Sequence, residues 1–476
     1  PFFDAHPPLG KYLIALGMYL GAGWSQFPGS IQPDWLQPGD LFDALHPVQY
    51  RWLNAFVGSF VPLTAAGVMR QSCAHPRQGY AYGLCAGVLV SLDGLLLVES
   101  RYALLNVYLV EFGLLAHWLG LLGMNYPRQR GGLWLGAGLC LGSAIAVKWN
   151  GLGFWLGWVM VWAIAKLGAR LGITPASGLL ARFANLSVPT MMLVWGVIPA
   201  LTYGLIWLPH LHLNQVDFGV IHQQLLGYHQ QVGTGSDVHP YCSAWYTWPL
   251  VLRPIAYFYQ TLTTNAPAAA WHYGLTPPPV GQIWVYDVHA IGNPLLWWFA
   301  TAAVLRCLVP WGWTLLKMAG AGLGRWRRAW HRAWQRWRRQ QRLQQQLWWQ
   351  QLRWPLPWRS QWRSQWRSQW RKTTDSALSD QALYLLVNYL ANWLPWLLVS
   401  RCLFLYHYLA AAIFAMLVLA LVLTATLTSP RRDYQIVGGS LLLTIAIAFW
   451  FWLPIYLGLP LFPDALEQRW WLEAWI

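Results

Sequence analysis

Ten long apolar stretches interrupted by few charges are the feature that most limits what this 476-residue chain can fold into. Each is close to the roughly 20 residues that an α-helix needs to cross a bilayer. Charged residues make up only 10% of the chain, whereas a soluble domain carries about 25%. The sequence therefore predicts an all-α polytopic membrane protein, with about ten visible spans near 52–69, 80–98, 102–124, 132–149, 151–167, 187–208, 291–317, 380–400, 403–428 and 434–456.

The connections between these stretches predict the orientation of the chain. Basic residues occur in every second connection: Arg70 and Arg77; Arg128 and Arg130; Lys166, Arg170 and Arg182; the block 325–372; Arg431 and Arg432. The alternate connections hold the acidic residues Asp4, Asp34, Asp40, Asp43, Asp217, Asp237, Asp287, Asp464, Glu467 and Glu473. Because cytoplasmic loops carry an excess of Lys and Arg, the first set is predicted to be cytoplasmic and the second external.

Six regions follow from this topology. They are an external first loop with a short interfacial helix (1–51), a six-span region (52–208), an external loop (209–290), one span (291–317), a basic cytoplasmic loop (318–379) and a three-span C-terminal region (380–476). Within the basic loop, 325–372 holds thirteen Arg, one Lys and no acidic residue, and so accounts for 14 of the net charge of +16. Its position between spans favours binding to anionic lipid headgroups over binding to nucleic acid.

Polar residues capable of chemistry gather on the predicted external side. Ionisable groups at membrane depth are costly and commonly functional; here they are Asp4, His6, Lys11, Glu99, Arg101, Lys148, Arg253, Arg401, Tyr406 and His407. Two interpretations fit Glu99 and Arg101, which either neutralise each other or bind an anionic group. The histidines of 209–290 match no compact zinc pattern, and the six cysteines form no CxxC pair. We therefore predict no metal or other cofactor.

Such a site suits chemistry on a phosphate-bearing lipid. Cations would stabilise the leaving phosphate as its negative charge develops. An acid-derived base would deprotonate the incoming hydroxyl.

Several segments, in order, resemble the protein O-mannosyltransferase family. Residues 3–11 read FDAHPPLGK, 93–106 read DGLLLVESRYALLN and 148–152 read KWNGL. Further matches are WPLVLRP at 248–254, IGNPLLWW at 291–298, and 394–408, which begins LPW and ends YHY. The resemblance covers nearly the whole chain, and its HPPLGK signature is specific.

The resemblance implies a fold of the glycosyltransferase C type with about eleven spans and an external active site. The implied activity is inverting transfer of mannose from a polyprenyl-phosphate donor to Ser or Thr hydroxyls of secreted proteins. It implies candidate catalytic roles for Asp4 and His6, and donor phosphate or sugar contacts for Lys11, Arg51, Glu99, Arg101, Lys148, Arg253, Arg401, Tyr406 and His407. A bacterial member is expected, in the plasma membrane with its active face outside, because 209–290 has no long soluble insertion.

The sequence departs from the family pattern in three ways. The family's paired Asp-Glu, which holds its catalytic base, precedes the FDxHPP motif and is not in this sequence, which opens on Pro1; we expect a further span upstream. Asn106 replaces a usual Asp, and Asp93-Gly94 replaces Asp-Asn. Three alternatives stay open: a related transferase with a lipid or polysaccharide acceptor, an inactive homologue, and a transporter of the lipid-linked sugar.

Overall fold

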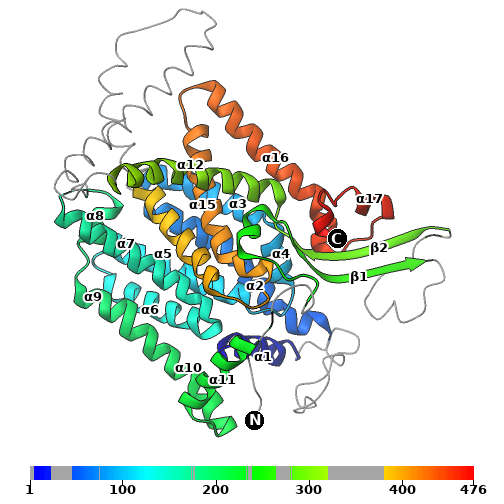
Figure 1. Cartoon of the computed structure of the whole chain (residues 1–476), viewed down its shortest axis with the longest axis horizontal. Helices are drawn as coiled ribbons and strands as arrows, with labels where there is room; N and C mark the ends of the chain where they lie inside the picture. The colour runs from blue at the N-terminus through cyan, green and yellow to red at the C-terminus, as the bar shows by residue number, and fades with distance from the viewer. Residues whose placement is uncertain are drawn as a thin grey trace, which may run out of the picture.

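A computed structural model describes residues 5–22, 46–73, 76–172, 174, 177–231, 233, 239–263, 279, 281–319 and 380–476. Figure 1 shows a body of packed helices from which one β-hairpin projects. The helices are α1 (Leu9–Ala22), α2 (Pro47–Ser72), α3 (Pro76–Ser91), α4 (Gly94–Arg101), α5 (Asn106–Asn125), α6 (Arg130–Val147), α7 (Leu152–Arg170), α8 (Leu179–Ala184), α9 (Val188–Met192), α10 (Ile198–Asn214), α11 (Phe218–Gln231), α12 (Pro294–Ala319), helical residues 380–393, α15 (Leu409–Leu427), α16 (Arg432–Leu457) and α17 (Pro463–Glu467).

The prediction of a polytopic helical membrane protein is confirmed, with a smaller number of long spans. Seven helices of the described part are long and apolar enough to cross a membrane, or up to eight if the bent pair α3–α4 is one span. The predicted spans 291–317 and 380–400 correspond to α12 (Pro294–Ala319) and to the helical residues 380–393. Predictions for Asp4 and for the block 325–372 concern positions outside the described residues.

The core lies around α15, which is apolar on every side. Fifteen of its residues are buried, as expected for a helix without a polar face. It packs against α3, α12 and α16. Close packing elsewhere uses small residues: a Cβ on Gly67 of α2 would lie 2.3 Å from the Trp118 ring of α5. This is how helices approach each other where water provides no driving force.

The predicted span 80–98 is broken at Asp93. Helices α3 and α4 meet there at 63°. The Asp93 side chain caps α4 by accepting the Leu96 amide (2.9 Å) and also accepts the Trp297 indole N–H (2.7 Å). A carboxylate with several donors can replace the helical hydrogen bonds lost at a break. The break turns α4, with Glu99 and Arg101, toward the β-hairpin.

Gly94 leaves no room for a side chain at this break. A Cβ would lie 2.1 Å from ring atoms of Tyr456 on α16 and 2.7 Å from the Ile291 carbonyl oxygen. We expect Gly94→Ala to lower the free energy of unfolding by about 1–3 kcal/mol through overpacking, seen as a lower midpoint in a thermal unfolding assay. Gly132→Ala is the matched control, since nothing lies within 4 Å of its Cβ. Equal midpoints for the two variants would contradict this explanation.

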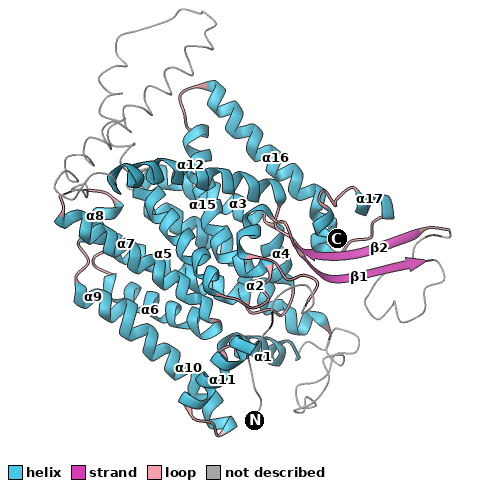
Figure 2. Ribbon diagram, in the orientation of Figure 1, coloured by secondary structure: helices cyan, strands magenta, loops and turns pink. Residues whose placement is uncertain are grey.

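A two-stranded antiparallel sheet, which was not predicted from the sequence, lies within the region 209–290 (Figure 2). Strand β1 (Ile255–Thr263) pairs with β2 (Ile283–Ala290). The outer edge of β2 is joined to the C-terminal segment by a bridge between Val285 and Leu461. Six consecutive residues of β2 are buried, and β2 packs against α4 and α16. The hairpin therefore starts inside the helical body, next to α4.

Candidate active site

The buried carboxylate of Glu99 is the centre of the candidate site. Glu99 lies in α4, and its side chain is 0% exposed. Its Oε2 accepts the Asn106 amide N–H at 2.9 Å, and its Oε1 accepts the Tyr257 hydroxyl. Both carboxylate oxygens are therefore hydrogen-bonded, as a buried charge requires. Because its lone pairs are engaged in this way, Glu99 is suited to holding its neighbours in place.

Tyr257 reaches Glu99 because of a β-bulge. The pairing register of β1 and β2 shifts between Ala256 and Phe258, which leaves Tyr257 without a partner on β2. Bulges commonly redirect one side chain beside an active site. The Tyr257 ring also packs edge-on against Tyr102, with centroids 5.2 Å apart. Burial, then the Glu99 carboxylate, raises the pKa of Tyr257 well above its usual value, so its hydroxyl stays protonated and donates.

Lys148 extends this hydrogen-bonded chain toward a group of cations and imidazoles. It ends α6 at the turn predicted from the sequence, is 6% exposed, and donates to Asn106 Oδ1 at 3.3 Å. Its ammonium lies 5.1 Å from the Tyr406 ring centroid. Burial, then the Arg401 charge, lowers the pKa of Lys148 to about 7, against the opposing effect of Glu99. Asn106 is the one hydrogen-bond partner of the Lys148 ammonium among the described residues.

His6, His229 and Arg401 complete this group. Burial lowers the pKa of His6 to about 3, helped by the nearby charges of Lys148, His229 and Arg401. Its ring centroid is 6.0 Å from that of His229 on α11. The half-buried Arg401 donates to the Cys402 carbonyl at 3.3 Å, and its other N–H groups have no hydrogen-bond acceptor in the described part of the chain. The group thus combines positive charge with unused donors, which is the chemistry of an anion site.

Arg51 and Arg101 form a second basic group beside Tyr102. The Arg51 guanidinium lies 4.5 Å from the Tyr102 ring centroid, and within the described residues no acceptor reaches its buried Nε. Arg101 donates to the Tyr456 carbonyl at 2.6 Å. Among the described residues Arg101 makes no ion pair with Glu99, and its role in binding an anionic group stays a prediction.

A disulfide joins two segments that border the site. Cys242 and Cys402 are bonded across 160 residues, with their Cα atoms 5.3 Å apart. The Cys402 amide donates to the Gly233 carbonyl at 2.8 Å, and the Ser243 amide donates to the Leu403 carbonyl at 2.8 Å. Together these bonds hold the loop that carries Arg401 and leads into residues 405–408.

Two predicted site residues, Lys11 and Arg253, lie apart from this group. His407 borders it, because its ring centroid is 4.6 Å from that of Tyr406 and it lies near the charges of Lys148 and Arg401. Lys11 on α1 lies near His210 of α10, and burial lowers its pKa to about 8. Arg253 donates to the backbone carbonyls of Pro240, Ala474 and Ile476. The ring of the buried His407 lies between Trp248 and Trp396, at 6.2 and 4.6 Å.

Local contacts explain the positions of Arg253 and His407. His407 Nδ1 accepts the Phe404 amide at 3.1 Å. Arg253 therefore ties down the C-terminal segment, and His407 orients the turn that carries Tyr406.

Four participants were not identified from the sequence: Tyr257, His229, Asn106 as a bridging residue, and the disulfide. A bulge depends on strand pairing, which no local pattern reveals. The disulfide could have been predicted from the sequence, however, because Cys242 and Cys402 are the two cysteines that fall in connections predicted to be external.

Two family models together span this chain. The model described as "Dolichyl-phosphate-mannose-protein mannosyltransferase" matches residues 1–216. The one described as "C-terminal four TMM region of protein-O-mannosyltransferase" matches 215–359 and 347–475. The chain belongs to the protein O-mannosyltransferase family. It is accordingly a membrane glycosyltransferase of protein O-mannosylation, as the sequence motifs predict.

Individual relatives agree with this assignment. A "Polyprenol-phosphate-mannose--protein mannosyltransferase" of Mycolicibacterium smegmatis is 23% identical over 529 aligned positions, covering 99% of this chain and 81% of the relative. "Protein O-mannosyl-transferase 2" of Danio rerio is 33% identical over 159 residues, or 32% of this chain and 19% of the relative.

The fold also matches a solved structure of this family. A chain of the S. cerevisiae protein O-mannosyltransferase Pmt1-Pmt2 complex bound to the sugar donor superposes with a TM-score of 0.67 at 15% identity. The match covers 100% of this chain and 86% of that chain. The described part of the chain thus has the fold of this family.

Proposed function

We propose that this protein O-mannosyltransferase transfers mannose from a polyprenyl-phosphate donor to a Ser or Thr hydroxyl, with inversion at the sugar. The acceptor oxygen attacks C1 of mannose opposite the phosphate. The bond from C1 to the phosphate oxygen breaks, the acceptor proton passes to a base, and polyprenyl phosphate leaves with an additional negative charge. The donor agrees with the name of the mycobacterial relative.

The observation that carries this proposal is the pair of cations with unused donors beside Glu99. The Arg401 charge lowers the pKa of Lys148, so the two cations lie near each other, and the described residues offer few hydrogen-bond acceptors to either. We assign both to the donor phosphate, where preorganised positive charge stabilises the charge that develops on the leaving group. Glu99 acts as a positioning residue, since it holds Asn106, which in turn holds Lys148.

The proposed base is an acidic residue rather than an imidazole. A general base works best with a pKa near the operating pH, and the pKa of His6 is lowered to about 3. His6 is therefore neutral at pH 7 and a weak base, and we assign it to hydrogen bonding with the substrate. Asp4, which precedes His6 by two residues in the sequence, remains the candidate base in this chain. Arg51, with Tyr102, remains a candidate contact for the sugar.

We further propose that the site faces the outside of a bacterial plasma membrane. The disulfide between Cys242 and Cys402 supports this orientation, because disulfides persist in oxidising compartments. Cys73, at the end of α2 that precedes the basic residue Arg77, is a free thiol. The distribution of thiol and disulfide therefore agrees with the distribution of charge.

The test is transfer of labelled mannose from polyprenyl-phosphate mannose to a Ser- and Thr-rich peptide by membranes that contain the chain. We expect O-linked mannose on the peptide by mass spectrometry, strongly reduced in Arg401→Gln and retained in Arg128→Gln, a matched change in another connection. Label in a lipid or polysaccharide product would favour the alternative acceptor. Intact donor with folded protein would favour an inactive homologue.

A further inference from the structure

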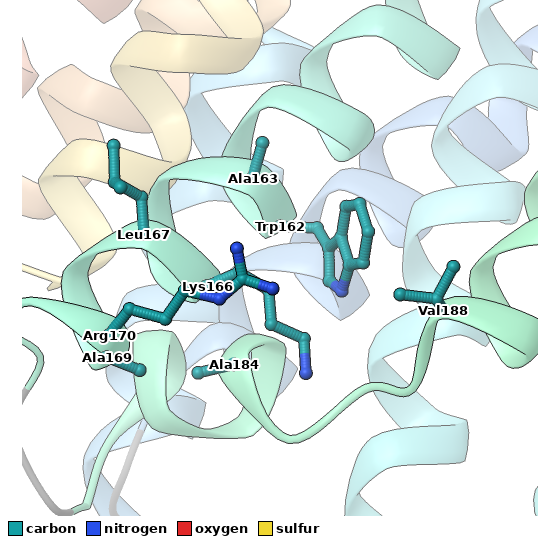
Figure 3. A pocket seen from close by; sticks show the side chains of 8 residues that line it. All are labelled: Trp162, Ala163, Lys166, Leu167, Ala169, Arg170, Ala184 and Val188. Atoms are coloured by element: carbon teal, nitrogen blue, oxygen red, sulfur yellow. The ribbon is translucent and has the colours of Figure 1, made fainter.

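Another pair of basic residues, Lys166 and Arg170, lies at the end of α7 opposite Lys148. A pocket of about 570 Å³ lies there. Figure 3 shows the side chains of Lys166 and Arg170 extending from α7, with the Trp162 indole beside them. The remaining lining residues are Ala163, Leu167, Ala169, Ala184 and Val188. The two cations are four residues apart on one helix and so share a face.

The walls of this pocket come from α7 and from the segment that joins α8 to α9. The Trp162 indole N–H donates to the Leu186 carbonyl at 3.1 Å and fixes that segment against α7. Three alanines line the pocket and leave space between these walls. In Figure 1, α8 lies at the end of the helical body remote from α11, which carries His229. The pocket is therefore separate from the candidate active site.

The charge in the pocket has no counterpart within the described structure. No acidic residue lines it, and neither the Lys166 ammonium nor the Arg170 guanidinium makes an ion pair or hydrogen bond with any described residue. Positive charge in an apolar recess favours an anion. The pocket thus favours a negatively charged occupant, which the described chain does not provide.

The surroundings show that this occupant also has an apolar part. The side chains of Leu167, Val188 and Met192 are 57%, 50% and 65% exposed, and α7 and 188–214 are candidate spans. These residues therefore face the hydrocarbon of the membrane. Arg170 ends its span, and Lys166 is long enough to extend its ammonium to the headgroup level. Trp162 places an indole at the same boundary, where Trp is enriched.

We propose that this pocket, the Lys166–Arg170 pocket, binds a phospholipid with a net negative headgroup in the leaflet opposite the active site. The phosphate oxygens accept from the guanidinium of Arg170 and the ammonium of Lys166, and one acyl chain lies along Leu167 and Val188. A zwitterionic headgroup is disfavoured because its own cation is brought toward two others. Basic pockets between membrane helices select anionic lipids for this reason.

The test is native mass spectrometry of the full chain, released from bilayers of equal parts phosphatidylglycerol and phosphatidylcholine. We expect one retained phosphatidylglycerol, preferred roughly tenfold or more over phosphatidylcholine. Lys166→Gln with Arg170→Gln loses this adduct, whereas Lys166→Arg with Arg170→Lys keeps it. Arg128→Gln with Arg432→Gln removes the same charge from other connections and also keeps it. Mannosyl transfer by the double glutamine variant shows that it is folded.

Three results would overturn the proposal. The double glutamine variant would retain phosphatidylglycerol as the wild type does, or the wild type would retain both lipids equally. The third result is displacement of the lipid adduct by millimolar inorganic phosphate, which would indicate a site for free phosphate that makes no use of the acyl chain. Retention of the adduct in excess phosphate supports a lipid site.

Discussion

Lys148→Met is expected to lower kcat/KM for the polyprenyl-phosphate donor by about 10²- to 10³-fold, the usual loss when one preorganised donor to a developing charge is removed. The physical reason is that Lys148 is buried, held by Asn106 and directed at the anion site with donors to spare. Initial rates at varied donor concentration give the measurement. Arg128→Met, which removes a charge in another connection, is the control and should keep the wild-type rate.

The same residue gives the reaction a pH dependence whose sign can be worked out. The pKa of Lys148 is lowered to about 7 in the donor-free enzyme, and a bound phosphate favours the charged form and raises this pKa. Donor binding therefore takes up a proton above pH 7. The value of kcat/KM is full below pH 7 and falls above it by up to tenfold per unit. Lys148→Arg should retain activity and abolish this decline; an unchanged decline would assign it to another group.

Removal of the disulfide by Cys242→Ser with Cys402→Ser is expected to lower kcat/KM for the donor at least tenfold. The bond holds the loop that positions Arg401, and misplacing a contact by about 1 Å can cost 10²-fold. The free energy of unfolding should also fall, by about 2–5 kcal/mol. Cys85→Ser is the control, since Cys85 is a free thiol.

A double-mutant cycle separates positioning of Arg401 from a general loss of stability. If the disulfide acts through Arg401, adding the serine substitutions to Arg401→Gln should raise the donor KM little further, because coupled residues are not additive. Fully additive effects on KM would show that the disulfide stabilises the fold without positioning Arg401. Reduction of the wild type, with free thiols verified by mass labelling, should reproduce the serine phenotype.

The sequence predicted the membrane class and the turn at Lys148 because both depend on local properties. Apolar length decides whether a helix spans, and a lysine between two apolar stretches marks a turn wherever the helices pack. The break at Asp93 was missed because apolar residues continue through it. It depends on a capping bond and on two donors some 200 residues away, Trp297 and the Asn293 amide. Such partners become visible only in the folded chain.

The candidate site was predicted in part for the same reason. Residue type and the predicted side of the membrane identified Glu99, Lys148, Arg401 and Tyr406, which the structure brings together. They could not distinguish these from Arg253, whose guanidinium is occupied by backbone carbonyls. Tyr257 could not be found in this way, since a tyrosine in a strand has nothing in its local sequence to show that a bulge redirects it.

The hydrogen bond between Tyr257 and Glu99 has a consequence for how this enzyme can be recombined. Glu99 and Lys148 belong to the region matched by one family model, and Tyr257 and Arg401 to the region matched by the other. Neither half contains a complete site. In a chimera that joins the first half of one relative to the second half of another, the buried carboxylate and its hydrogen-bond donor would therefore come from two different proteins. Its activity would depend on whether a tyrosine in the foreign hairpin reaches that carboxylate, however well each half folds.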